Sequence, residues 1–334
     1  MSPLPWSRRD FLASAGATAA ALAVGCRPGA APNASPAASP AADKLGALGV
    51  GLFTLPKSLG EDLDGTLAMM AGLGYREVEL FGPYPFSVQS VRDQWAQVGK
   101  MLGFTGSGYF GLTAAQFRAR LDAHGLVAPS AHIDLETLRD RTEQVGEAAR
   151  ILGHQYVGIA TIPEDRRGSL DDWRRMADEL NAIGARARPL GFKVLYHHHG
   201  EGWAPVDGQV PARVVFDRLD PSLVSLEMDV FWTVASGGDP VELLDAYPKL
   251  YRLMHVKDMS RQVRFAHGGD MQDLISLGAA MTPAGTGVLD LPRILGHAKR
   301  NGVEHFYVEQ DLAANPPEQL GASIRNLRAM TLVV

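Results

Sequence analysis

The chain alternates short apolar runs of strand length with longer segments that have helical periodicity. This alternation is typical of βαβ units, in which successive strands lie parallel to one another. We expect eight strands, over residues 48–55, 77–81, 128–133, 156–160, 193–198, 224–229, 250–256 and 306–309. Eight such units predict an α/β fold of the closed (β/α)8 type, a TIM barrel, as a single domain.

Segments with helical periodicity lie between the predicted strands. The expected helices cover residues 63–73, 114–124, 135–152, 170–190, 240–246 and 291–301, and 316–330 closes the ring. A glycine such as Gly74 or Gly153 follows several of them, where it supplies the left-handed residue that ends a helix. Two surplus segments, 83–111 and 259–285, are predicted as long loops over the carboxyl ends of the strands, where barrel active sites lie.

The first residues have the pattern of an export signal. Ser7-Arg-Arg-Asp-Phe-Leu12 matches the twin-arginine motif and precedes a weakly apolar stretch, Leu12 to Val24, that is too short to span a bilayer. We therefore interpret residues 1–26 as a twin-arginine signal peptide and expect the protein in the periplasm or on the outer cell surface. Leu22-Ala-Val-Gly-Cys26 resembles a lipobox, which leaves two alternatives: a lipid anchor at Cys26 or ordinary cleavage nearby.

Composition limits the partners that the chain can have. Residues 27–43 form a Pro/Ala/Ser-rich linker that we expect to be disordered, and the barrel domain spans residues 44–334. The net charge of −5, without a long basic run, argues against nucleic acid. Because Cys26 is the only cysteine, metal ligands in the folded domain must be His, Asp or Glu. A membrane partner is expected only through a lipid anchor, and a homo-oligomer is left open.

The fifth to eighth predicted strands each end in a side chain that can bind a metal. These side chains are His197, Asp229, His255 and Glu309. Since the carboxyl ends of neighbouring barrel strands meet at one mouth, the four groups are expected to converge. Two imidazoles and two carboxylates suit a divalent ion such as Mn²⁺, Co²⁺, Zn²⁺, Fe²⁺ or Mg²⁺. Within the run of three histidines, His197 and His199 share a face, so either of them can be the strand-five ligand.

Strand alternation brings further side chains to the same mouth. Lys257 shares a face with His255 and is predicted as an acid, a base or an oxyanion partner, with a salt bridge to a carboxylate as the alternative. The predicted substrate contacts are His132, His199, Glu227, Trp203 and Trp232. The two tryptophans offer flat apolar faces for a sugar ring, although large aromatic residues more often pack in a core.

Several motifs of the chain resemble the sugar phosphate isomerase/epimerase family of xylose isomerase-like TIM barrels. The resemblance runs from about Leu48 to Leu327. It is densest in Tyr196-His-His-His199, Glu227-Met-Asp-Val-Phe-Trp232, Gly238-Asp-Pro-Val241, His255-Val-Lys-Asp258, Gly285-Thr-Gly287 and Phe306-Tyr-Val-Glu-Gln-Asp311. It implies that Asp229, His255 and Glu309 bind the metal and that Glu309 also moves a proton. The family has a second glutamate where this chain has His197, so His197, Lys257 or His132 would have to take over its role.

The resemblance implies a metal-dependent sugar isomerase or epimerase that acts through a metal-stabilised enediolate. Loss of a β substituent from the same intermediate would instead make the chain a lyase or hydratase of keto-sugars or 3-keto-glycosides. The missing glutamate adds weight to this second outcome. A third alternative is a non-catalytic, exported sugar-binding protein, against which Glu309 and Lys257 argue. In each case the expected partner is a small-molecule carbohydrate.

Overall fold

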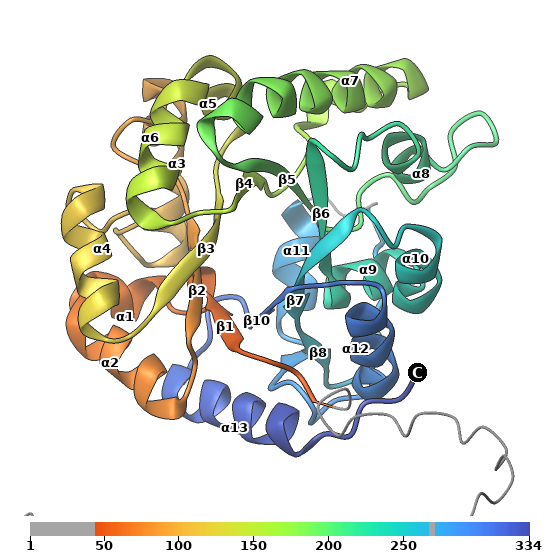
Figure 1. Ribbon diagram of the computed structural model, residues 1–334. Helices are drawn as coiled ribbons and strands as arrows, with labels where there is room; N and C mark the ends of the chain where they lie inside the picture. The colour runs from red at the N-terminus through yellow and green to blue at the C-terminus, as the bar shows by residue number, and fades with distance from the viewer. Residues whose placement is uncertain (1–43, 267–270) are drawn as a thin grey trace, which may run out of the picture. The chain divides into compact units, whose positions relative to one another are not determined.

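Eight parallel strands close into a barrel in the computed structural model, which describes residues 44–266 and 271–334 (Figure 1). The strands of the barrel are β1 (Leu48–Gly51), β2 (Glu77–Phe81), β3 (Val127–His132), β4 (Tyr156–Ile159), β5 (Lys193–His198), β6 (Val224–Asp229), β7 (Tyr251–Val256) and β10 (His305–Val308). Their order around the barrel is β1-β10-β7-β6-β5-β4-β3-β2. The predicted TIM barrel is confirmed, whereas the signal-peptide, lipobox and linker predictions lie outside the described residues.

Helices surround the strands (Figure 1). They are α1 (Pro56–Glu61), α2 (Leu63–Leu73), α3 (Gln89–Leu102), α4 (Ala114–Ala123), α5 (Leu135–Asp140), α6 (Thr142–Leu152), α7 (Leu170–Ala187), α8 (Pro211–Phe216), α9 (Val230–Ser236), α10 (Pro240–Ala246), α11 (Met271–Gly278), α12 (Leu291–Arg300) and α13 (Pro316–Ala329). Gly74 and Gly153 end α2 and α6 with φ of 105° and 83°, the left-handed conformation expected from the sequence. No helix in the described residues has both the length and the hydropathy needed to cross a membrane.

Several segments differ from the sequence prediction. The strand expected over 48–55 ends at Gly51, and Leu52–Thr54 form a 3₁₀ turn. The expected loop at 83–111 contains α3, which places Val91, Trp95 and Val98 at helical spacing on a partly buried face. The single helix expected over 135–152 is two helices, because Arg141 leaves the helical conformation with φ of −127° and ψ of 29°. The expected loop at 259–285 contains α11 and an antiparallel pair, β8 (Asp258–Met259) with β9 (Met281–Thr282).

A layer of large side chains fills the barrel directly beneath its carboxyl end. Tyr156, Leu195, Leu253 and Tyr307 are buried and form a cluster of their own, separate from the core beneath the helices. Residues two apart on a strand share a face, so Leu195, Leu253 and Tyr307 lie one layer below residues 197, 255 and 309. The next layer up therefore holds the side chains predicted to form the site.

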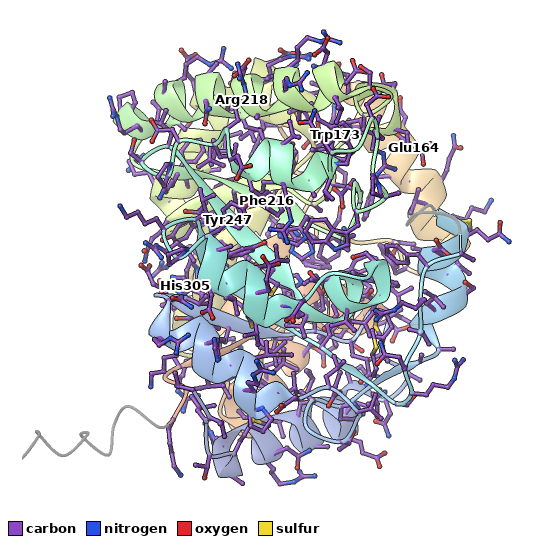
Figure 2. The ribbon with its side chains drawn as sticks, turned by 90° about the vertical axis from the view of Figure 1, so that its right-hand side faces the viewer. Glu164, Trp173, Phe216, Arg218, Tyr247 and His305 are labelled. Atoms are coloured by element: carbon purple, nitrogen blue, oxygen red, sulfur yellow. The ribbon has the colours of Figure 1, made fainter. Side chains whose placement is uncertain are left out.

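The outer face of β7 packs against the surrounding helices. Phe216, the last residue of α8, makes an edge-on ring contact with Tyr247 at 5.4 Å (Figure 2). It makes another with Tyr251 at 6.2 Å. These rings, together with the buried apolar side chains of α7 and α12, stabilise the strands that carry the site from outside.

Candidate active site

The ends of β5, β6, β7 and β10, which are neighbours in the barrel, bring four predicted ligands together. His255 Nδ1 lies 2.8 Å from Glu309 Oε2 and 3.9 Å from Asp229 Oδ2. His197 Nε2 lies 3.8 Å from Asp229 Oδ2. All four side chains are buried, with Glu309 the most exposed at 7%. The ligand atoms of Asp229, His255 and Glu309 lie within 4.8 Å of one another, as a shared cation requires.

Two of these ligand atoms are buried without a well-directed hydrogen bond among the described residues. Asp229 caps α9 through Oδ1, which accepts from Trp232 N at 3.0 Å, while its Oδ2 faces the site. His255 Nδ1 likewise faces the site. Asp229 Oδ2 forms an ion pair with Lys257 Nζ, and His255 Nδ1 lies against Glu309 Oε2. These closely spaced nitrogen and oxygen atoms are the kind of ligand set that binds a divalent cation. The cluster is consistent with a divalent metal site.

Lys257 sits at the rim of this cluster. Its Nζ lies 2.9 Å from Asp229 Oδ2, 2.8 Å from Glu309 Oε2 and 2.7 Å from Asp311 Oδ1. Burial alone would lower the pKa of Lys257, but these three carboxylates outweigh it and raise that pKa well above its usual range. The salt bridge that the sequence offered as an alternative is therefore present, and the role of Lys257 as acid or base stays a prediction.

Two of the three carboxylates beside Lys257, those of Glu309 and Asp311, differ in their protonation. Burial would raise the pKa of Glu309, but His255 and Lys257 outweigh it and hold that pKa well below its usual range. Asp311 is partly exposed, and burial raises its pKa to about 6 against the opposing charge of Lys257. Glu309 is therefore suited to bind a metal, and Asp311 is suited to exchange protons near neutral pH.

His197 and His199 share a face and both reach the site. Their Nε2 atoms are 3.3 Å apart, and with Asp229 they form a second group of converging ligand atoms. Burial, reinforced at His197 by nearby imidazoles and opposed at His199 by Asp229, lowers the pKa of both rings and favours the neutral form that binds metals. His198 faces the other way, with Nε2 3.0 Å from Tyr251 Oη. Both alternatives for the strand-five ligand remain compatible with the geometry.

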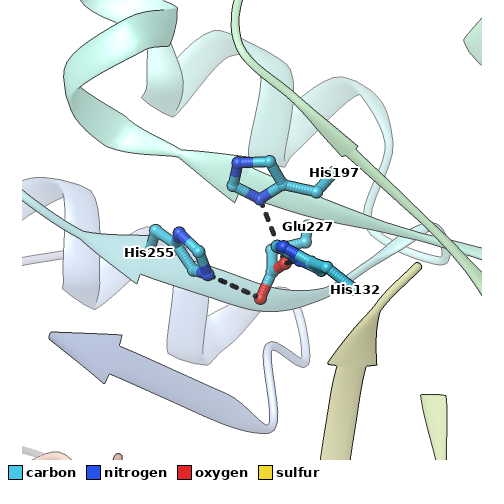
Figure 3. Close-up of side chains that lie close together, drawn as sticks. All are labelled: His132, His197, Glu227 and His255. Carbon is cyan, nitrogen blue, oxygen red and sulfur yellow. Dashed lines mark hydrogen bonds and ion pairs between the residues drawn. The ribbon is translucent and has the colours of Figure 1, made fainter. Parts of the chain in front are cut away.

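Below the predicted ligands, Glu227 lies among three imidazoles, those of His132, His197 and His255 (Figure 3). Glu227 Oε2 is 2.8 Å from His132 Nε2 and 3.0 Å from His197 Nδ1. Burial, together with the charge of Glu79, raises the pKa of Glu227 to about 7. Glu227 was expected to contact substrate, yet it has no exposed surface and lies beneath a ligand, where it contacts imidazole rings.

Glu79, on β2, is a member of this lower layer that sequence reasoning missed. Its Oε2 lies 2.5 Å from His255 Nε2 and 3.4 Å from His132 Nε2, and only 2% of the residue is exposed. The sequence feature that could have identified it is the position of the Glu79 carboxylate in the middle of the predicted strand over residues 77–81. Such a group is rarely buried unless it has partners, so it marks an inward-facing polar contact.

The two predicted tryptophans lie in different places. Trp232 adjoins the site, with its ring centroid 5.9 Å from Lys257 Nζ and 6.4 Å from the ring of His199. Trp203 lies away from the predicted ligands, against Phe216 and the outward-facing His198. Among the predicted substrate contacts, the structure therefore brings His132, His199, Glu227 and Trp232 to the cluster and leaves Trp203 outside it.

The closed barrel has a buried cluster of imidazoles and carboxylates at the carboxyl ends of its strands. These two features define the class of the protein as a TIM barrel with a candidate metal-binding site. The model of the xylose isomerase-like TIM barrel family matches residues 67–330. The chain belongs to this family, as the sequence motifs indicated.

Similar solved structures share the fold. A sugar phosphate isomerase/epimerase from Parabacteroides distasonis superposes with a TM-score of 0.64 and 22% identity, covering 88% of this chain and 96% of that chain. The IOLI protein with a bound zinc atom gives a TM-score of 0.60 and 17% identity, covering 84% of this chain and 96% of that chain. At these identities the likeness establishes the fold alone.

A curated relative matches part of the sequence more closely. An inosose dehydratase from Lacticaseibacillus casei is 32% identical over 180 residues, which are 50% of this chain and 58% of that protein. The match therefore spans little more than half the length of the relative. Both isomerases or epimerases and dehydratases are thus represented among the proteins that this chain resembles.

Proposed function

We propose that the chain is a metal-dependent enzyme that dehydrates a polyhydroxy ketone, such as a keto-sugar or a related cyclic keto-polyol. The observation that carries the proposal is the imidazole of His197 at the end of β5, where the symmetric epimerases of the family have a second glutamate. One side of the site then has two carboxylates, Glu309, whose lowered pKa keeps it ionised, and Asp311, with a pKa of about 6, and the other side has the neutral imidazoles of His197 and His199. The partial match to an inosose dehydratase supports the same reaction class.

The metal ligands in this proposal are Asp229, His255, Glu309 and one of His197 and His199, a mixed nitrogen and oxygen set. When bound, a divalent ion polarises the substrate carbonyl and so makes the neighbouring C–H more acidic.

The proton transfers are assigned to Asp311, and the Lys257 ammonium, which its raised pKa keeps protonated, donates a hydrogen bond to it. A base removes the proton from the carbon next to the carbonyl, and the electron pair forms a carbon–carbon double bond as the hydroxyl on the following carbon leaves. That hydroxyl takes a proton from the acid and departs as water, and the resulting enol becomes a dicarbonyl product. Asp311, with a pKa of about 6, can accept or donate a proton near neutral pH, and Lys257 Nζ lies 2.7 Å from it as a donor.

Isomerisation or epimerisation is the second candidate. It shares the first step, and it follows if the proton returns to a neighbouring carbon or to the other face while the hydroxyl stays. The observation in its favour is the partial exposure of Asp311, whose side chain is 21% exposed, because a carboxyl group in contact with solvent can exchange its proton between the two steps. The family membership is compatible with both candidates.

NMR in D₂O separates these candidates from one another and from a non-catalytic sugar-binding protein. Metal-loaded protein would be incubated with a panel of ketoses, aldoses, inososes and 3-keto-glycosides. Dehydration predicts deuterium next to the carbonyl together with loss of a hydroxyl, and isomerisation predicts deuterium with the hydroxyl retained. The Lys257→Met variant should slow either reaction at least a hundredfold, as expected for loss of a positioned hydrogen-bond donor. Binding of a sugar without deuterium uptake by the wild type would contradict both enzymatic proposals.

We also propose that the enzyme works outside the cytoplasm, in the periplasm or on the outer cell surface. The support is the twin-arginine motif with its apolar stretch and the lipobox-like residues before Cys26. The proposed partner is a small carbohydrate, and the acidic net charge of −5 argues against nucleic acid.

A further inference from the structure

We propose that Glu79 and Glu227 are positioning residues that hold the two candidate imidazole ligands in opposite tautomers. His255 would then bind the metal through Nδ1, and His197 would bind it through Nε2. The inference rests on the metal site of the proposed function, but not on the reaction that the site performs.

The contacts of His255 define its tautomer. Its Nε2 lies 2.5 Å from Glu79 Oε2, and a carboxylate oxygen accepts a hydrogen bond, so Nε2 carries the hydrogen. In the neutral ring that binds a metal, the lone pair is then on Nδ1, which lies 2.8 Å from Glu309 Oε2. Nδ1 and the Glu309 oxygen can lie this close when a proton or a metal ion is between them, and a bound metal ion would displace the proton. The side of His255 opposite Glu79 is therefore the side that faces the metal.

His197 has the reverse arrangement. Its Nδ1 lies 3.0 Å from Glu227 Oε2 and carries the hydrogen of the neutral ring. Its Nε2 then presents the lone pair, 3.8 Å from Asp229 Oδ2 and 3.3 Å from His199 Nε2. The two rings thus direct different nitrogen atoms toward Asp229, and each has a buried carboxylate on its far side.

The two carboxylates are themselves held by partners on other strands. Ser130 Oγ on β3 donates to Glu79 Oε1 at 2.5 Å, and it lies 3.0 Å from Tyr307 Oη on β10. Glu227 on β6 also accepts from His132 Nε2 on β3 at 2.8 Å. Both carboxylates are at most 2% exposed, so water does not replace these contacts. A ring that turned over would remove one of the hydrogen bonds of a buried carboxylate, which is costly because no water replaces it.

The test compares Glu79→Gln with Glu77→Gln. Both changes remove one negative charge from the inward face of β2, but Glu77 lies at the start of the strand and bonds His305 Nδ1 at 2.8 Å. Zn²⁺ affinity would be measured by competition with a chelator, and the tautomers by NMR of Zn²⁺-loaded protein containing ring-¹⁵N histidine. We expect Glu79→Gln to weaken Zn²⁺ binding by roughly 10- to 100-fold, and Glu77→Gln to leave it nearly unchanged. The wild-type spectrum should show His255 bound through Nδ1 with a hydrogen on Nε2.

Ser130→Ala is the second variant if Glu79→Gln does not fold, because it removes only the hydroxyl that orients Glu79. It should weaken Zn²⁺ binding in the same direction by a smaller factor. Binding of His255 through Nε2, equal effects of the two glutamine variants, or two Zn²⁺ ions per chain would overturn the inference. Predicted tautomers without deuterium uptake from any substrate would overturn the proposed reaction alone. A wild-type protein that binds no Zn²⁺ would overturn the metal site and this inference together.

Discussion

At the scale of single residues, His154 shows how burial controls protonation in this barrel. The residue is 6% exposed, and its Nδ1 donates to Ala128 O at 2.6 Å. Burial lowers its pKa to about 4, so the folded protein keeps this ring neutral where the unfolded chain, with an ordinary histidine pKa, takes up a proton. The contribution of His154 to stability is therefore complete at neutral pH, is lost as the pH falls from about 6.5 toward 4, and changes no further below that.

We predict that His154→Gln makes the protein less sensitive to acid. Between pH 7 and pH 4.5, titration of this ring should lower the free energy of unfolding of the wild type by roughly 2.5 kcal/mol, and the variant should lack that part of the loss. Urea unfolding at both pH values measures it. An identical acid response of His154→Gln and the wild type would contradict the assigned pKa.

At the scale of elements, Asp258 holds the long segment that follows β7. Its Oδ2 accepts from Gly285 N and Gly287 N, both at 2.9 Å, and its Oδ1 accepts from Met259 N at 2.8 Å and Leu289 N at 3.2 Å. Asp258 is 1% exposed. One buried carboxylate thus satisfies four backbone N–H groups and fixes both ends of the β8–β9 pair, next to Lys257.

Asp258→Asn should destabilise the protein strongly. The amide NH₂ would face N–H groups that need an acceptor, so we expect a loss of roughly 2–4 kcal/mol in the free energy of unfolding. Asp62→Asn makes the same chemical change at the N-cap of α2, where Asp62 Oδ1 accepts from Gly65 N at 2.9 Å. Asparagine caps helices about as well as aspartate, so this control should change stability by about 0.5 kcal/mol or less. Similar losses in thermal or urea unfolding for the two variants would refute the anchoring role.

Strand elements were predictable from the sequence because their apolar runs are short and sharply bounded. The limits predicted for β5 and β6, residues 193–198 and 224–229, are those of the structure. Helix α3 was missed because most of its side chains are exposed and only a weak apolar stripe marks it.

For the site, the alternation of side chains along strands correctly placed Asp229 and His255 at the same end of the barrel. It could not reveal the contact between Glu79 and His255, which joins β2 to β7 across the barrel, because sequence spacing contains no distance between strands that are not neighbours.

At the scale of the whole molecule, export can be tested independently of the site. Replacing both arginines of the motif, Arg8→Lys with Arg9→Lys, should leave the protein in the cytoplasm, because the export route recognises the arginine pair. Fractionation of cells followed by immunoblotting measures this. Cys26→Ser should release the protein from membranes if the lipobox is used, and it should have no effect if ordinary cleavage occurs nearby. Unchanged export of the double lysine variant would contradict the twin-arginine assignment.

In the proposed metal site, β5, β6, β7 and β10 deliver ligand atoms to one shared cation. The most direct test of this site is the metal content of purified protein after dialysis against a divalent ion, measured for the wild type and for Asp229→Asn. This variant keeps the Oδ1 atom that caps α9 and removes the charge at the Oδ2 atom that faces the site, so the fold should persist while the metal is lost. We predict about one ion per chain in the wild type and little in the variant. A wild type that retains no ion, or a folded variant that retains as much as the wild type, would contradict the account.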